Sequence, residues 1–240
     1  MLDLVKQQLA PTGVLRAGIN MGNFLLANKS DVDGKPIGVS PGIAKALAES
    51  LGLSVEFVGF DSPGAVADAL ADNAWDIANI GAEPERAKTI TFSDPYCEIE
   101  ATYLVPEGSD IESIDQVDQA GRRISVYART AYGLWLCENL KNAEIVKTAG
   151  MDESFEVFVE RELDALAGIR PRLAKDQQML PGSRILSGQF SSVQQAIGTR
   201  PEYVEAAAYV QTFIEKSKKN GLIVDLIEQH GVTGLLSVAG

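Results

Sequence analysis

The sequence has few of the residues that metal and redox sites require. Its 240 residues include one histidine, His230, and two cysteines, Cys97 and Cys137. Structural zinc sites take about four ligands, mostly Cys and His, so we expect no metal centre. Two cysteines are too few for a disulfide framework, and we expect both to be buried free thiols.

Nucleotide-binding motifs are also missing. Neither G-x-x-x-x-G-K-[ST] nor G-x-G-x-x-G occurs, so the chain lacks the glycine-rich loops whose backbone N–H groups cradle phosphates. We therefore expect no cofactor.

Positive charge is scarce. The chain has 21 Lys and Arg against 33 Asp and Glu, a formal net charge of −12. Binding to nucleic acid needs a basic face that neutralises phosphates, so the charge argues against nucleic acid and against an anionic membrane surface. No apolar run reaches the length of about 18 residues that a membrane-spanning helix needs.

The N-terminal residues leave two locations open. They lack the basic start and the apolar stretch of a secretory signal peptide. The protein is periplasmic if a leader precedes the printed chain, and cytoplasmic if Met1 is the native start.

What the sequence does contain is a repeated strand–helix rhythm. Apolar residues alternate over 14–19 and recur every four residues over 43–51, as in a strand and an amphipathic helix. Further strands are predicted at 55–60, 76–80, 101–105, 123–127, 144–147, 163–167 and 192–197, and helices at 65–71, 131–140, 154–161, 201–218 and 222–229. This alternation predicts an α/β fold with mostly parallel sheets.

The rhythm stops at a turn-rich break, residues 106–110, and then restarts. We predict two lobes, each with a mostly parallel sheet, joined by two hinge strands. Lobe 1 comprises residues 1–105 and 192–240, and lobe 2 comprises 106–191. Hinged lobes close on ligands, and we expect the protein to be a monomer.

One catalytic motif has to be weighed. Residues 38–42, GVSPG, match G-x-S-x-G, the nucleophile elbow of serine hydrolases. The residue after the serine should donate its N–H to the oxyanion hole, but Pro41 has none. We interpret Ser40 as the N-cap of the following helix, with Pro41 at its first position, and expect no catalytic residue.

The most informative segment is 76–96, DIANIGAEPERAKTITFSDPY. The predicted strand ends at Ile80 and Gly81 allows a turn. Arg86 follows just beyond the carboxyl end of the strand, where open α/β sheets bind ligands. Arginine offers a carboxylate a planar, two-pronged set of donors. The alternative is a surface ion pair of Arg86 with Glu83 or Asp94.

This segment resembles the signature of type II periplasmic solute-binding proteins of the polar-amino-acid ABC transporter class, the bacterial extracellular solute-binding protein family 3. In that family a strand and a small-residue turn lead to (T/D)-x-x-R and then F-S-x-P-Y, and residues 82–86 and 92–96 fit. Residues 12–18, 43–53 and 121–126 extend the resemblance over nearly the whole chain. It implies a two-lobe fold, a small-molecule ligand and an ABC transporter permease as partner.

The resemblance also implies ligand-binding residues. Arg86 resembles the arginine that clamps the ligand's carboxylate, and Gly81 and Ala82 lie where backbone and small hydroxyl groups assist it. Thr130 and Ala131 resemble a second-lobe loop that donates N–H groups at a helix N-terminus, a natural anion site. Further candidates are Glu83 in the same segment, and Asn20 and Asn23 in the loop after the first strand.

Three positions depart from the family pattern. One is the approach to the first helix, where Ser40 and Gly42 stand instead of the family's acidic residue. The family's amino-acid binders carry an acidic residue just after the strand at 163–167, to hold the ligand's ammonium group, but Gly168, Ile169 and Arg170 stand here. Arg129 replaces the usual glycine before the second-lobe threonine. Arg129 and Arg170 could meet a second anionic group or point to solvent, and both readings stay open.

The leading hypothesis is a binding protein that closes on a carboxylate-bearing solute, amino-acid-like or an organic acid, because the ligand favours the closed state. The first alternative is an enzyme on the same scaffold that resembles cyclohexadienyl dehydratases, with Glu83 as general acid. The second is a cytoplasmic ligand sensor.

Overall fold

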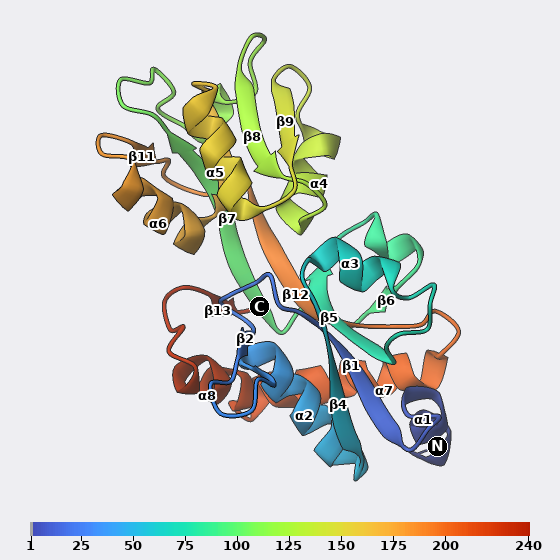
Figure 1. Ribbon diagram of the computed structural model, residues 1–240. Helices are drawn as coiled ribbons and strands as arrows, with labels where there is room; N and C mark the ends of the chain where they lie inside the picture. Colours follow the sequence, from blue (N-terminus) through green and yellow to red (C-terminus); the bar gives the residue numbers. More distant parts are fainter. Residues whose placement is uncertain (1) are drawn as a thin grey trace. The chain divides into compact units, whose positions relative to one another are not determined.

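A computed structural model describes residues 2–240, which divide into two compact units (Figure 1). Unit 1 holds the residues up to Glu98 and from Gln194 onward, and unit 2 is Ile99–Val193. Strand β7 (Cys97–Val105) leads from unit 1 into unit 2, and strand β12 (Ser191–Thr199) leads back. The boundaries proposed from the sequence, after residue 105 and before residue 192, stay a prediction.

In unit 1, three neighbouring strands of the sheet run parallel. Its strands besides β12 are β1 (Val14–Asn20), β4 (Ser54–Phe60), β5 (Ile77–Ala82), β6 (Thr91–Phe92) and β13 (Ser237–Val238). β1 runs parallel to both β4 and β5, whereas β12 runs antiparallel to β5 and β6. The predicted parallel strands are therefore present, and β12 makes the sheet mixed. Because parallel strands end at one edge, Asn20, Phe60 and Ala82 share the carboxyl edge of this sheet.

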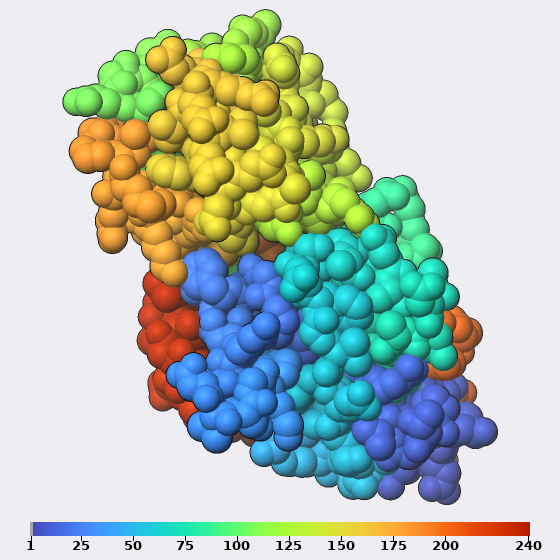
Figure 2. Space-filling model, viewed as in Figure 1, coloured from blue at the N-terminus to red at the C-terminus, as the bar shows by residue number. Residues whose placement is uncertain are grey.

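Five helices and a small hairpin complete unit 1. They are α1 (Leu2–Leu9), α2 (Val39–Leu51), α3 (Pro63–Asp68), α7 (Val204–Lys219), α8 (Leu222–Gln229), and the hairpin of β2 (Asn28–Lys29) and β3 (Pro36–Ile37). On the viewed face of unit 1, the blue surface of the hairpin and α2 lies beside the cyan surface of α3 (Figure 2).

Helix α2 has the buried apolar stripe that the sequence predicts. Ile43, Leu47 and Leu51 are all buried, and Gly52 ends the helix with the left-handed φ of 66° that glycine adopts easily. The predicted N-cap is wrong. Gly38 is the N-cap, at φ 135°. Only glycine fits at this position, because a Cβ would lie 2.3 Å from the Leu26 carbonyl oxygen.

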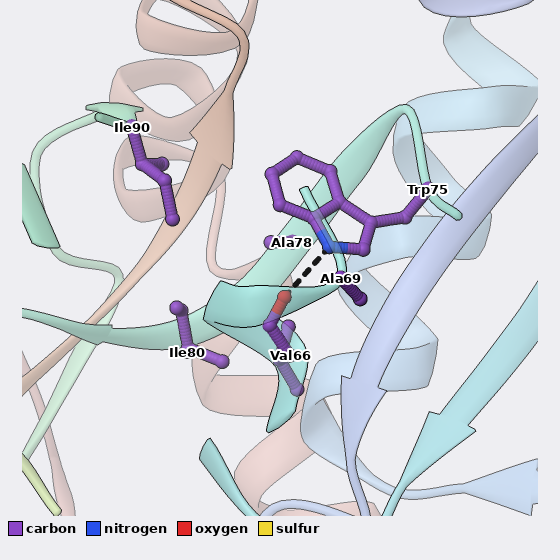
Figure 3. Packing of buried hydrophobic residues seen from close by; sticks show 6 residues of the cluster. All are labelled: Val66, Ala69, Trp75, Ala78, Ile80 and Ile90. Carbon is purple, nitrogen blue, oxygen red and sulfur yellow. Dashed lines mark hydrogen bonds between the residues drawn. The ribbon is translucent and has the colours of Figure 1, made fainter. Parts of the chain in front are cut away.

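A hydrophobic cluster fixes one face of β5 (Figure 3). Trp75 is fully buried, and its indole N–H donates to the Val66 carbonyl oxygen in α3 at 2.8 Å. Ala78 and Ile80 pack in the same cluster. Since strand side chains alternate between faces, Asn79 and Gly81 lie on the opposite face of β5. The cluster members are Val66, Ala69, Trp75, Ala78, Ile80 and Ile90.

Unit 2 repeats the arrangement. Its elements besides β7 are β8 (Arg123–Tyr127), β9 (Glu144–Thr148), β10 (Ala165–Ile169), β11 (Arg184–Ile185), α4 (Ala131–Asn139), α5 (Met151–Glu160), α6 (Arg170–Met179) and the short turn η2 (Ile114–Gln116). β8 is parallel to β9 and β10, while β7 is antiparallel to β10 and β11. In each unit the parallel strands present one carboxyl edge, as in an α/β fold, and the strands of both units are hydrogen-bonded into a single path in the order β4-β1-β5-β12-β7-β10-β8-β9.

The structure corrects two further expectations. Helices α1 and α6 were not predicted from the sequence. The α6 sequence, RPRLAKDQQM, is so polar that its one buried large apolar residue, Leu173, makes no readable stripe. Both cysteines are free, as expected, but only Cys97 is buried, because Cys137 lies on an exposed position of α4.

Candidate functional site

Arg86 lies in a tight turn just past the carboxyl end of β5. It begins the 3₁₀ turn η1 (Arg86–Lys88). Its side chain is only 5 % exposed, and its Nη1 donates to the Gly81 carbonyl oxygen at 2.6 Å. The guanidinium is therefore a desolvated cation held against the strand end.

Glu83 holds this turn in place. Its Oε1 accepts the backbone N–H of Arg86 at 2.7 Å, and its Oε2 accepts that of Glu85 at 2.8 Å. Oε1 also lies 3.6 Å from Arg86 Nε, and the Glu83 side chain is 7 % exposed. The alternative reading from the sequence, a pair of Arg86 with Glu83, is thus present, but the pair is buried and not on the surface.

The loop after β1 brings Asn20 and Asn23 to the same edge of unit 1. The Asn20 Oδ1 accepts the Gly22 N–H at 3.1 Å, and the Asn23 Oδ1 accepts the Leu25 N–H at 3.2 Å. Such bonds from a side chain to a nearby backbone N–H are typical of asparagine in turns. Both side chains shape the loop, and their proposed contact with a ligand stays a prediction.

A buried polar cluster lies on the α2 side of β5, and the sequence analysis did not find it. The Ser40 and Tyr96 hydroxyl oxygens are 2.8 Å apart, and the Tyr96 hydroxyl donates to Asn79 Oδ1 at 3.5 Å. Burial raises the pKa of Tyr96 above its usual value, so the phenol stays protonated. The alternation along β5 could have marked Asn79, the one polar side chain in that strand.

Ser40 does not have the surroundings of a nucleophile. It is the second residue of α2, and its hydroxyl partner is a tyrosine instead of a histidine. It is also 2 % exposed. Pro41 follows it without an N–H, so the backbone beside Ser40 has no donor for an oxyanion there.

In unit 2, Thr130 and Ala131 form the N-terminus of α4 at the carboxyl end of β8. Thr130 is the N-cap: its Oγ1 accepts the Gly133 N–H at 3.0 Å and donates to the Tyr127 carbonyl oxygen at 2.9 Å. Ala131 is the first helical residue. The predicted helix start is confirmed, and the positive end of the helix dipole faces the carboxyl edge of this sheet.

The two arginines that depart from the family pattern lie at this edge of unit 2. Arg129 has φ 61°, the left-handed conformation that glycine adopts more easily. Arg170, at the start of α6, donates to Glu100 Oε2 and to the Gly188 carbonyl oxygen, both at 2.5 Å. β8 and β10 are parallel neighbours, so both arginines follow strands that end at one edge. Their contact with a second anion stays a prediction.

The candidate residues therefore fall into two groups. Unit 1 brings together Arg86, Gly81, Ala82 and Glu83 on one strand–turn segment, and Asn20 and Asn23 beside it. Unit 2 holds Arg129, Thr130, Ala131 and Arg170. Within residues 2–240 no group of three or more His, Cys, Asp or Glu side chains has the arrangement of a metal site. In the same range, every helix is too short or too polar to cross a bilayer.

Two α/β units linked by β7 and β12 are features of the type II periplasmic binding protein fold. The chain belongs to the family of bacterial extracellular solute-binding proteins, family 3, whose model matches residues 15–233. The expected fold class and family are thus confirmed. No curated protein sequence matches the chain.

Solved structures of similar proteins cover almost the whole chain. An ancestral amino-acid-binding protein, a precursor of cyclohexadienyl dehydratase, is 26 % identical, with a TM-score of 0.72 over 95 % of this chain and 98 % of that one. A solute receptor for L-cysteine of Neisseria gonorrhoeae is 21 % identical, with a TM-score of 0.78 over 98 % and 99 %. A substrate-binding protein of an amino acid ABC transporter from Streptococcus pneumoniae, bound to L-arginine, is 20 % identical, with a TM-score of 0.74 over 93 % and 97 %.

Proposed function

We propose that this protein binds a small carboxylate-bearing solute with contacts from both units and closes on it without chemical change. It would serve as the substrate-binding component of an ABC transporter. The observation that carries the proposal is the buried Arg86 just past the carboxyl end of β5. Family membership supports the solute-binding role.

The electrostatic surroundings of the Arg86 guanidinium favour a bound anion. Burial of a guanidinium is costly unless anions or dipoles surround it. Glu83 Oε1 lies 3.6 Å from Arg86 Nε. Both carboxylate oxygens of Glu83 also accept hydrogen bonds from backbone N–H groups. A ligand carboxylate would strengthen this site, because a planar two-oxygen anion matches the arginine geometry. The α4 N-terminus in unit 2, capped by Thr130, supplies a second region that favours an anion.

The residues at the end of β10 bear on the class of ligand. The 26 % identical relative is described as amino-acid-binding, and amino acids carry an ammonium group. Here β10 ends in Ile169, which is buried and apolar, and the nearby Glu100 is paired with Arg170. We therefore favour an organic acid, or an amino-acid-like ligand whose nitrogen is uncharged.

The dehydratase alternative has one observation in its favour, the description of that relative as a precursor of a dehydratase. A general acid must carry a proton on one oxygen. Both oxygens of Glu83 accept backbone N–H groups of its own turn, so this carboxylate holds the turn that carries Arg86. This arrangement supports binding over catalysis.

The location of the protein follows from the transporter role. We propose that it works outside the cytoplasmic membrane with a permease as partner. A cytoplasmic ligand sensor is the alternative. Release by osmotic shock from the source cells would support the first, and retention with cytoplasmic markers the second.

Thermal-shift screening tests the binding proposal. A ligand that binds only the folded protein raises its melting temperature. At a ligand concentration a hundredfold above Kd, the free energy of unfolding rises by about 2.7 kcal/mol. We expect small monocarboxylates to raise it in the wild type and in Lys88→Ala, and not in Arg86→Ala. Lys88 is the matched control because it carries the same charge in the same turn but is exposed and paired with Glu85. Equal shifts in all three proteins would exclude the arginine clamp.

Closure can be tested separately. The ligand that gives the largest thermal shift should reduce the radius of gyration measured by small-angle X-ray scattering, because it favours the closed state. A ligand that raises the melting temperature and leaves the radius unchanged would contradict closure but not binding.

A further inference from the structure

The side chain of Asn79 has an unmet hydrogen-bonding group in the interior of unit 1. Asn79 is fully buried in β5, and its Nδ2 has no hydrogen-bond partner among residues 2–240. Its Oδ1 accepts from the Tyr96 hydroxyl at 3.5 Å. Buried polar groups in native proteins are almost always satisfied, so an unmet donor at a strand centre calls for a partner.

The direction of the hydrogen bonds identifies what that partner must offer. The Tyr96 hydroxyl donates to Asn79 Oδ1, so its oxygen is available to accept from the Ser40 hydroxyl at 2.8 Å. The chain of donors therefore runs from Ser40 through Tyr96 to Asn79 and ends at Nδ2. An amide reversed about its axis would leave the oxygen unmet instead. In either orientation one end of the amide lacks a partner.

The position of Asn79 relates it to the Arg86 site. Residues two apart on a strand point to the same face, about 7 Å apart. The next residue on the face of Asn79 is Gly81, which has no side chain. The Gly81 carbonyl oxygen is the acceptor for Arg86 Nη1. Asn79 thus lies one strand repeat below the residue that anchors the arginine.

We propose that Asn79 is a specificity-determining residue, whose Nδ2 donates to a neutral oxygen of the ligand while Arg86 holds the carboxylate. The ligand class is then an oxo or hydroxy monocarboxylic acid. Ser40, Tyr96 and Asn79 bear no charge, so a second carboxylate here would be buried without compensation. This inference rests on the proposed function, because it assumes the carboxylate at Arg86.

Calorimetric titration with three acids of one chain length tests the inference. 2-Oxopentanoate and 4-oxopentanoate carry an oxygen that only accepts, and pentanoate carries none. In the wild type we expect at least one oxo acid to bind about tenfold tighter than pentanoate, the loss expected when a buried donor is left without an acceptor. In Asn79→Leu, which is similar in size and apolar, the preference should disappear while pentanoate binding stays within about threefold.

The controls separate this inference from the proposed function. Arg86→Ala should lose affinity for all three acids, and the ligand-free melting temperature shows whether Asn79→Leu is folded. If Asn79→Leu is not folded, Asn79→Ser replaces it, because serine is polar but too short to reach the ligand oxygen. Equal wild-type affinities, or an oxo preference that survives in the folded Asn79 variants, would overturn the inference alone. Wild-type binding of 4-hydroxypentanoate without either oxo acid would show a reversed amide and overturn the donor assignment. Failure of every acid to bind the wild type would overturn the proposed function with it.

Discussion

Replacement of Arg86 by alanine is the sharpest test of the site. The variant loses a guanidinium that is 5 % exposed and donates to the Gly81 carbonyl oxygen. A ligand carboxylate would then be buried without its counter-charge. We expect Arg86→Ala to bind a carboxylate ligand far more weakly than the wild type, with the loss mainly in the dissociation rate.

The magnitude can be worked out from burial. Loss of one partner of a buried, hydrogen-bonded charge pair costs about 2–5 kcal/mol. At about 1.4 kcal/mol per tenfold change in Kd, the affinity should fall by about two orders of magnitude or more. Arg86→Lys should recover only part of this, because lysine keeps the charge but loses the planar pair of donors.

The same substitution should also lower stability, because Glu83 and the Gly81 carbonyl oxygen lose a buried partner. We expect a loss of about 1–3 kcal/mol without ligand, measured by urea unfolding. Isothermal titration of wild type, Arg86→Ala, Arg86→Lys and the control Lys88→Ala separates the effects. If Arg86→Ala is folded and its Kd is unchanged, the clamp is wrong.

Three further outcomes are expected. Ser40→Ala should leave ligand affinity within about tenfold and abolish no esterase activity, since Pro41 has no N–H for an oxyanion; a folded variant that lost a measured esterase activity would refute this. α-Amino acids should bind more weakly than matched acids without an ammonium group, and Ile169→Asp should narrow the gap; tight wild-type binding of an ordinary α-amino acid by calorimetry would contradict it. Burial lowers the pKa of His230 below 6.5, so the unfolded chain takes up a proton more readily than the folded one. Stability should therefore be complete above about pH 6.5 and fall below it, and His230→Gln should flatten that slope in urea unfolding; an unchanged slope would count against it.

Much of the fold could be predicted because its signals are local. The apolar period of α2 and the glycine after it gave a helix whose observed end is the predicted one, at Leu51. Helix α8, Leu222–Gln229, matches its predicted range. The Asn220-Gly221 pair before it marks the break from α7. A helix can be predicted from the sequence where its own residues show the apolar periodicity and a glycine or asparagine marks its end.

The errors arose where distant contacts decide. Ser40 lies two residues after Gly38, in the first turn of the helix, and has the right chemistry for an N-cap. Its hydroxyl is instead hydrogen-bonded to that of Tyr96, 56 residues later. The N-cap is Gly38. The Leu26 carbonyl oxygen leaves no room for a side chain at residue 38. Cys137 lies within an apolar stretch of α4 whose outward face no sequence period reveals.

We expect the identity of the ligand to depend on a few side chains. Arg129 has a left-handed φ of 61°, a conformation that suits the glycine of the family pattern, and it adds a positive charge directly before Thr130. Ile169 ends β10 in regular register with Ala101, so an acidic group is replaced by an apolar one without a change in the strand. Glu83 caps its turn with a carboxylate as the shorter residues of the pattern would. The scaffold therefore predicts that a solute is bound, and we propose that these substitutions, together with the donor of Asn79, determine which one.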